Sequence, residues 1–205
     1  MAFVTADNHP AVLAALRAEQ ESVAASHGPD LTPAAVAAMP YLEAVIKETN
    51  RLFPIVSGVF RKALVDLDVC GYRVPAGERV MVMLGQTQFE IEEFKGDLAS
   101  FRPERWLSLA RDPPAWMPWG AGPHICLGMG LAQSEIRVVL AALVRGYEWA
   151  PVDPGAVAAW RAPLQPADGV PVQVWRRGTP RPPPAVVVDK VAEGKAADAW
   201  WVAAT

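Results

Sequence analysis

Three stretches of the chain have apolar residues that recur with the period of an α-helix: residues 10–21, 39–52 and 127–147. The first begins with Pro10, whose fixed φ suits a first helical turn, and the second ends before Pro54, which cannot continue a helix. We therefore predict a helix over each stretch. The apolar positions that define them are Val12, Leu13, Leu16, Leu42, Val45, Ile46, Leu52, Leu131, Ile136, Val139, Leu140 and Leu143.

Between these helices the pattern changes. Residues 59–83 consist of short Val-rich runs broken by turn-forming residues, which predicts a β-hairpin, and a weaker hairpin is expected over residues 160–175, turning at Asp168-Gly169. Residues 101–128 are irregular and rich in proline and glycine. Loops of this length usually carry function, so the candidate chemistry is sought there.

Composition excludes several classes of protein. Of 205 residues, 52% are hydrophobic and the net charge is −3, with no block of Lys and Arg that could neutralise a phosphate backbone, so we do not expect a nucleic-acid partner. The two cysteines and three histidines are too few and too widely spaced for a disulfide framework or a structural zinc site. Neither a signal peptide nor a membrane-spanning run is visible.

A lone cysteine, Cys126, lies in a glycine-dense loop directly before the third predicted helix. Glycines let the backbone approach a flat ligand where a Cβ would clash, and the amides of a helix N-terminus favour thiolate over thiol. A buried thiolate with this support suits an axial ligand of haem iron, because a sulfur donor promotes O–O cleavage. The other cysteine, Cys70, is predicted to be a small buried hydrophobe in the hairpin.

Residues 119–128 read Trp-Gly-Ala-Gly-Pro-His-Ile-Cys-Leu-Gly, which resembles the haem-ligand signature of the cytochrome P450 family, Phe-Gly-x-Gly-x-Arg/His-x-Cys-x-Gly. The resemblance implies haem, iron protoporphyrin IX, as the cofactor, with Cys126 as the axial ligand. It also implies that His124 contacts a haem propionate, and that Trp119, at the usual Phe, lies against the proximal face near the sulfur. The implied cofactor-binding positions of this loop are Cys126, His124, Trp119, Gly120, Gly122 and Gly128.

Three further segments resemble the same family. Glu-Thr-Asn-Arg at residues 48–51 is similar to its Glu-x-x-Arg helix motif, and Phe-Arg-Pro-Glu-Arg-Trp at residues 101–106 is similar to the segment whose last arginine joins that pair. The resemblance implies a buried structural network of Glu48, Arg51 and Arg105 that holds the cysteine loop. The third segment, Phe-Arg-Lys-Ala at residues 60–63, is similar to the family's strand segment, and the resemblance implies that its Arg61 binds the second propionate.

The resemblance runs from about residue 9 to 175 and implies a mainly α fold with small β-sheets, the C-terminal part of the cytochrome P450 fold. Residues 1–177 are expected to form the C-terminal haem-binding portion, and residues 178–205 a Pro-rich linker and tail. Family members are more than twice as long as this chain. The missing N-terminal half carries most substrate contacts, any membrane anchor and the proton-delivering acid–alcohol pair, so no catalytic residue is identifiable here.

By resemblance, the function is a monooxygenase that inserts one oxygen atom from O2 into a lipophilic substrate. Electrons come from an NADPH-dependent reductase or a ferredoxin, and residues 54–63 are similar to the branch that oxidises retinoids, abscisic acid and sterol-like terpenoids. One alternative is a non-catalytic haem-binding remnant that lacks the distal half. A cysteine-nucleophile enzyme is a weaker alternative, because no third group is identifiable to orient His124.

Overall fold

The computed structural model describes residues 9–152, 160–161, 165–166 and 171–183. The helices are α1 (Pro10–His27), α2 (Pro33–Ala37), α3 (Pro40–Leu52), α4 (Leu84–Thr87), α5 (Glu104–Leu107) and α6 (Met129–Gly146), with short 3-10 turns at Gln88–Glu90, Glu92–Phe94 and Gly122–His124. The strands are β1 (Val59–Lys62), β2 (Leu67–Val69), β3 (Tyr72–Val74), β4 (Arg79–Val82), β5 (Tyr147–Pro151), β6 (Trp160–Arg161), β7 (Gln165–Pro166) and β8 (Val172–Arg176). This composition confirms the mainly α fold with small β-sheets.

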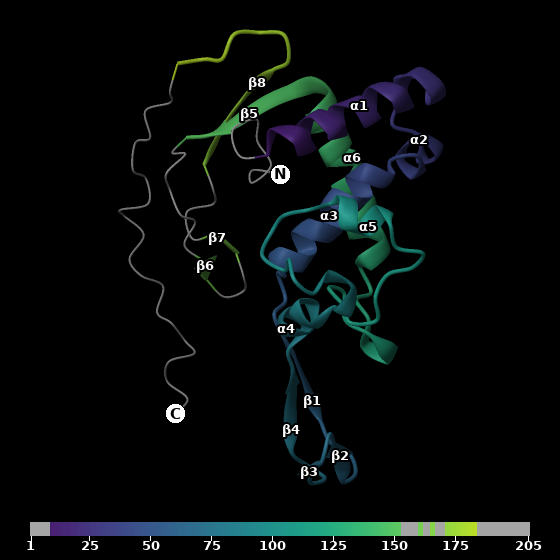
Figure 1. Cartoon of the computed structure of the whole chain (residues 1–205), viewed down its shortest axis with the longest axis vertical. Helices are drawn as coiled ribbons and strands as arrows, with labels where there is room; N and C mark the ends of the chain where they lie inside the picture. The colour runs from purple at the N-terminus through teal and green to yellow at the C-terminus, as the bar shows by residue number, and fades with distance from the viewer. Residues whose placement is uncertain (1–8, 153–159, 162–164, 167–170, 184–205) are drawn as a thin grey trace.

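Helices α1, α3 and α6 pack together and form the main core, at one end of the molecule (Figure 1). The apolar positions predicted for the first two helices supply half of its buried side chains, including Leu13, Leu16, Leu42 and Val45. The apolar face predicted for the third helix is wrong: α6 buries Ala141 and Val144 instead, whereas Leu131 and Val139 are exposed. Helix α1 also holds the start of α3: the Glu19 carboxylate accepts the amides of Tyr41 and Leu42 at 2.5 and 2.9 Å. A carboxylate at a helix N-terminus satisfies amides that have no partner within the helix.

The observed bounds of two helices differ from the predicted ones. Helix α1 continues to His27 rather than ending at residue 21, because residues 22–27 include good helix formers, and it stops before Gly28, whose φ is +85°. Helix α6 begins at Met129, with Gly128 as its N-cap.

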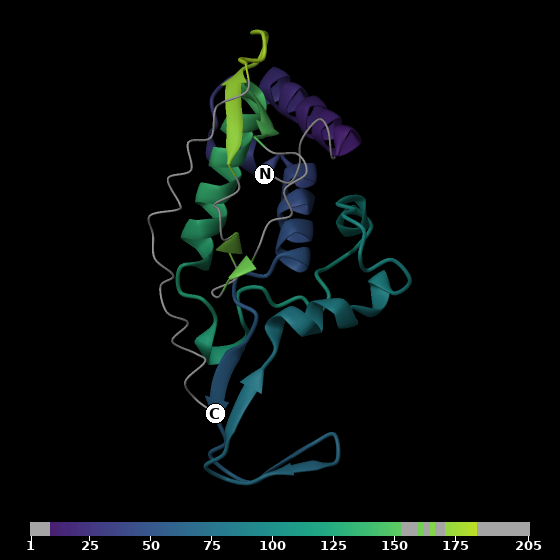
Figure 2. The same cartoon turned by 90° about the vertical axis from the view of Figure 1, so that its left-hand side faces the viewer.

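The hairpin prediction for residues 59–83 is confirmed and gains detail. Strands β1 and β4 pair antiparallel, from Val59 opposite Val82, and β2 and β3 form a second antiparallel pair between them. This hairpin extends away from the helices (Figure 2). The prediction for Cys70 is wrong: the residue is exposed in the turn between β2 and β3, where its φ is +53°.

The prediction of one hairpin over residues 160–175 is wrong. Residues 172–176 instead pair antiparallel with residues 147–151, which leave α6 directly, and β6 and β7 form a separate two-residue ladder. A turn-forming pair of residues predicts a local hairpin, but it cannot show that a strand pairs with a distant segment of the chain. The predicted turn at Asp168-Gly169 and the predicted tail beyond Pro183 lie outside the described residues.

Candidate functional site

A pocket of about 310 Å³ lies where the end of α3, strand β1, the start of α4 and the cysteine loop meet. Four predicted cofactor-binding side chains line it together: Arg61, Trp119, His124 and Cys126. The remaining lining residues are mostly apolar, namely Asn50, Pro54, Ile55, Val56, Val59, Leu84, Pro118 and Gly120. The structure thus brings together residues that lie some 60 positions apart in the sequence.

The cysteine loop has a defined backbone. The Cys126 amide donates to the carbonyl of Trp119 at 2.9 Å, and a single 3-10 turn, Gly122–His124, lies between the two residues. Gly120 and Gly122 have φ values of +77° and +69°, which a residue with a side chain adopts only with strain. Substituting either glycine would therefore distort the loop.

Cys126 is free and exposed, although a buried thiolate was expected. Its side chain lines a pocket that the described residues leave open, which explains the exposure. A Cβ built on Gly128 would lie 4.0 Å from the Cys126 Sγ, an ordinary van der Waals contact, so the space beside the sulfur does not by itself require a glycine there. Of the predicted glycines, Gly120 lines the pocket, whereas Gly122 and Gly128 shape the loop around it.

Arg61 and His124 lie at the pocket with hydrogen-bonding capacity to spare. The Arg61 guanidinium donates to the carbonyl of Phe60 at 2.8 Å, and neither it nor His124 forms an ion pair with any described residue. Donors in this state suit an anionic group of a ligand. Within the described part of the chain, no cluster of three or more His, Cys, Asp or Glu side chains could hold a bare metal ion.

A fully buried carboxylate, that of Glu48, lies at the centre of the predicted network. It accepts both Nε and Nη2 of Arg51 at 2.9 Å, and Nε of Arg105 at 3.1 Å. The Arg51 and Arg105 side chains also donate to the carbonyls of Leu98 and Ser100, which fixes the segment before α5. The three predicted residues are therefore in direct contact.

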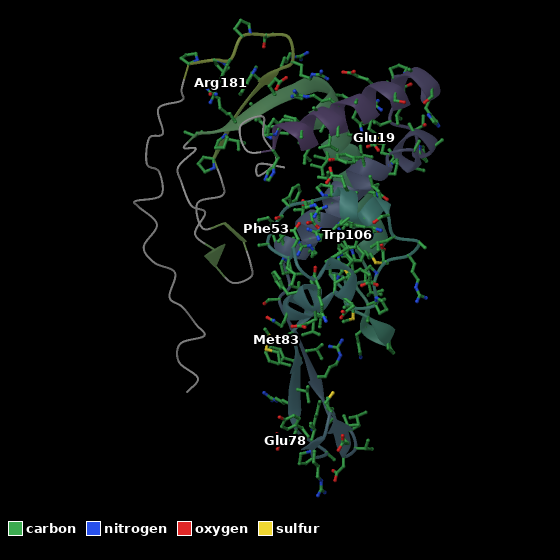
Figure 3. The ribbon with its side chains drawn as sticks, viewed as in Figure 1. Glu19, Phe53, Glu78, Met83, Trp106 and Arg181 are labelled. Carbon is green, nitrogen blue, oxygen red and sulfur yellow. The ribbon has the colours of Figure 1, made fainter. Side chains whose placement is uncertain are left out.

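Trp106 is a member of this network to which the family motifs assigned no role. Its Nε1 donates to Glu48 Oε2 at 2.8 Å, where α3 and α5 meet (Figure 3). The available signal was chemical: a buried indole N–H needs an acceptor, and Trp106 directly follows Arg105 in the motif. The Arg102 amide gives Glu48 a further hydrogen bond of 2.9 Å.

Burial by itself would raise the pKa of Glu48, because desolvation disfavours the charged form. The hydrogen bonds from Arg51, the Arg102 amide and Trp106, together with the positive charge of Arg51, outweigh that effect. The pKa of Glu48 therefore lies below its ordinary value, and the carboxylate is ionised at neutral pH.

A second contact from α3 holds the Pro-rich loop that leads to Cys126. Lys47 pairs with Asp112 at 2.5 Å, and its ammonium lies 5.9 and 5.4 Å from the ring centroids of Trp106 and Trp116. Cation–π contact within about 6 Å is attractive, so Lys47 fastens this loop to α3.

Comparison with known proteins places these features in one family. The family model described as Cytochrome P450 matches residues 1–159. Methyltetrahydroprotoberberine 14-monooxygenase of Papaver somniferum is 34% identical, with 72% of this chain and 29% of the relative covered. Abscisic acid 8'-hydroxylase 3 of Oryza sativa subsp. indica is 33% identical, with 84% of this chain and 35% of the relative covered.

Solved structures agree. A cyanobacterial P450 with bound retinoic acid is similar to this chain with a TM-score of 0.72 and 28% identity, over 82% of this chain and 39% of that one. The chain spans about a third of the length of the curated relatives it matches. By sequence and by structure, the chain belongs to the cytochrome P450 family, whose members use haem iron.

Proposed function

We propose that residues 1–177 are the C-terminal haem-binding portion of a cytochrome P450 monooxygenase, with Cys126 as the axial thiolate ligand. The observation that carries the proposal is the pocket in which Cys126 lies together with Arg61, Trp119 and His124. Residues 178–205 are assigned to a Pro-rich linker and tail on their sequence alone.

The residues present fit haem, a flat apolar ring that carries two carboxylates. The apolar side chains of the pocket suit the ring, Cys126 offers a free sulfur, and Arg61 and His124 offer donors for the two propionates. Arginine stays charged at any working pH, whereas histidine does not, so Arg61 is the stronger anion contact. Bound haem iron would supply the oxygen chemistry of the family.

The chain's own contribution is to hold the sulfur in place. Gly120 and Gly122 give the loop the backbone path that presents Cys126, and Trp119 lines the same pocket. Glu48, Arg51 and Arg105 are positioning residues, since they hold the segment before α5 and do not line the pocket.

The proposed reaction is insertion of one oxygen atom from O2 into a lipophilic substrate of terpenoid, retinoid or sterol-like type. The names of matched relatives support this class: an abscisic acid 8'-hydroxylase, a 3beta,22alpha-dihydroxysteroid 3-dehydrogenase and a P450 solved with retinoic acid. Electrons would come from a separate NADPH-dependent reductase or a ferredoxin.

A non-catalytic haem-binding module is the second candidate. A distal pocket that excludes water and orients a substrate is not found among the described residues. With haem and reductase present, this chain alone is therefore expected to release peroxide rather than oxidise a terpenoid. Product formed at the rate of reductant consumption would contradict that expectation.

Absorbance spectroscopy tests the ligand directly. The reduced chain under carbon monoxide should show the red-shifted Soret band of thiolate-ligated ferrous haem, and Cys126→Ala should lose it. Cys70→Ala is the matched control, because Cys70 is also a free, exposed thiol but lies in the β2–β3 turn. Loss of the band in the control, or its survival in Cys126→Ala, would remove Cys126 as the ligand.

A further inference from the structure

The Pro-rich segment that follows β8 is held against that strand. The Gln173 side-chain amide donates to the carbonyls of Pro182 and Pro183 at 3.3 and 2.6 Å, and the Arg181 guanidinium lies 5.4 Å from the centroid of the Trp175 ring. Gln173 and Trp175 are alternate residues of β8, so their side chains leave the same face of the strand. The segment thus has a defined place at the end of the molecule opposite the β1–β4 hairpin (Figure 1), where Figure 3 labels Arg181.

The sequence of this segment favours a polyproline II helix over residues 180–183. A proline ring holds φ near about −65°, and a residue that precedes a proline is driven to an extended ψ. Residues 181, 182 and 183 each precede a proline, and residues 180, 182 and 183 are prolines themselves. Because this helix has three residues per turn, Pro180 and Pro183 lie on one edge and Pro182 lies on another.

The exposure of the prolines agrees with this geometry. Pro180 and Pro183 are exposed, whereas Pro182 is half-buried. The contacts with β8 use the carbonyls of Pro182 and Pro183 and the side chain of Arg181. They therefore hold the segment in place and leave the rings of Pro180 and Pro183 facing solvent.

The surroundings of this edge are positively charged. Residues 172–183 contain three arginines, at positions 176, 177 and 181, and no acidic residue. Arg177 approaches Glu21 and Glu148 only to 3.4 and 4.0 Å, and neither Arg176 nor Arg181 forms an ion pair with a residue that the structure describes. An acidic partner surface would complement this charge.

We infer that Pro180 and Pro183 form an exposed Pro-x-x-Pro edge that docks in the aromatic-lined groove of an SH3-type domain with an acidic rim. Such domains bind Pro-rich segments by packing aromatic side chains against a polyproline II helix. The helix is preformed, and its contact with β8 orders it further, so little conformational entropy remains to be lost on binding. The inference concerns a surface apart from the Cys126 pocket and does not rest on haem binding.

The probe is an array of purified SH3 domains, with WW and EVH1 domains beside them, incubated with the purified full chain. We expect at least one SH3 domain with an acidic rim to bind, and its affinity is then measured by calorimetric titration. Pro180→Ala combined with Pro183→Ala should weaken binding by roughly tenfold or more, because the exposed rings are lost. The backbone carbonyls remain in this variant, so the contact with Gln173 is retained.

Pro75→Ala is the matched control. Pro75 is also exposed, but it lies in the turn between β3 and β4 and has Glu78, not a proline, three residues later. The affinity of this variant should equal that of the wild type.

Four results would overturn the inference. They are no binding by any SH3 domain, binding only by WW or EVH1 domains, binding that survives the double proline substitution, and an equal loss with Pro75→Ala. Binding that high salt abolishes but the proline substitutions leave unchanged would belong to the third case, because it would report the charge of the arginines alone.

Discussion

Replacing Glu48 by alanine should cost about 3–5 kcal/mol of the free energy of unfolding, because it leaves buried charges without their counter-charge. Glu48 accepts hydrogen bonds from five donors, and the Arg51 side chain is 0% exposed. Carbonyls of the segment 97–100 retain part of the hydrogen bonding of Arg51 and Arg105 in the variant, so the loss stays within this range. Domains of this size are stable by only about 5–15 kcal/mol, so the change is large.

Urea denaturation of the variant beside a matched control measures the effect. Glu43→Ala is suitable, because Glu43 lies on the same helix and pairs with Arg137 at 2.6 Å in a partly exposed position. Such a pair is worth about 1 kcal/mol or less. If Glu48→Ala cost no more than Glu43→Ala, the buried network would not support the fold in the way argued here.

The pH dependence of the same network follows from its charge state. The pKa of Glu48 is lowered in the folded chain below its ordinary value of 4.5, so its contribution is complete above that value and is lost as pH falls through the lower folded pKa. The difference in unfolding free energy between the wild type and Glu48→Gln should therefore be constant near neutrality and shrink below about pH 4.5. A difference that is the same at pH 3 and pH 7 would refute the assigned charge.

Two further contacts of α3 give separate predictions. The Tyr41 hydroxyl donates to Glu104 at 2.6 Å, and burial, together with that bond and the charges of Glu104 and Glu19, raises the pKa of Tyr41. Absorbance titration should therefore show a phenol that ionises above the ordinary pKa of 10.0, and Tyr41→Phe should abolish this step. Lys47→Met should lower the free energy of unfolding by about 1 kcal/mol and speed hydrogen exchange over residues 109–118, because the loop loses its ion pair and cation–π contacts. Unchanged exchange over these residues would contradict the anchoring role of Lys47.

Local sequence patterns predicted the elements that depend on local physics. The three helices follow from their apolar period, and the hairpin over residues 59–83 follows from its turns. The pairing of β5 with β8 could not be predicted in this way, because it joins Tyr147 to Arg176 across a long connection and depends on how the chain leaves α6. Cys70 was misplaced for a related reason: cysteines are usually buried, but this one occupies a tight turn.

The sequence predicted only those site residues that belong to family motifs. The motifs named Glu48, Arg51 and Arg105, which are in contact in the structure, and they named the four side chains that share the pocket. They did not assign Trp106 to the network, and they did not place Lys47 against two indoles. Those contacts join residues 58 or more positions apart, and only the packed structure brings them together.

Helix α3 unites these observations, because it contacts or continues into three segments that border the cysteine loop or its pocket. Glu48 holds the segment before α5, and Lys47 holds the Pro-rich loop after it. The helix ends at Leu52, two residues before Pro54, which lines the pocket. The loop that presents Cys126 is irregular, and between Trp119 and Cys126 it contains one 3-10 turn and a few backbone hydrogen bonds. The buried charges of α3 add support from outside the loop, through the segments that lead to it. This is a physical reason for a carboxylate and two guanidinium groups to be retained inside the protein, where apolar residues would pack at lower desolvation cost.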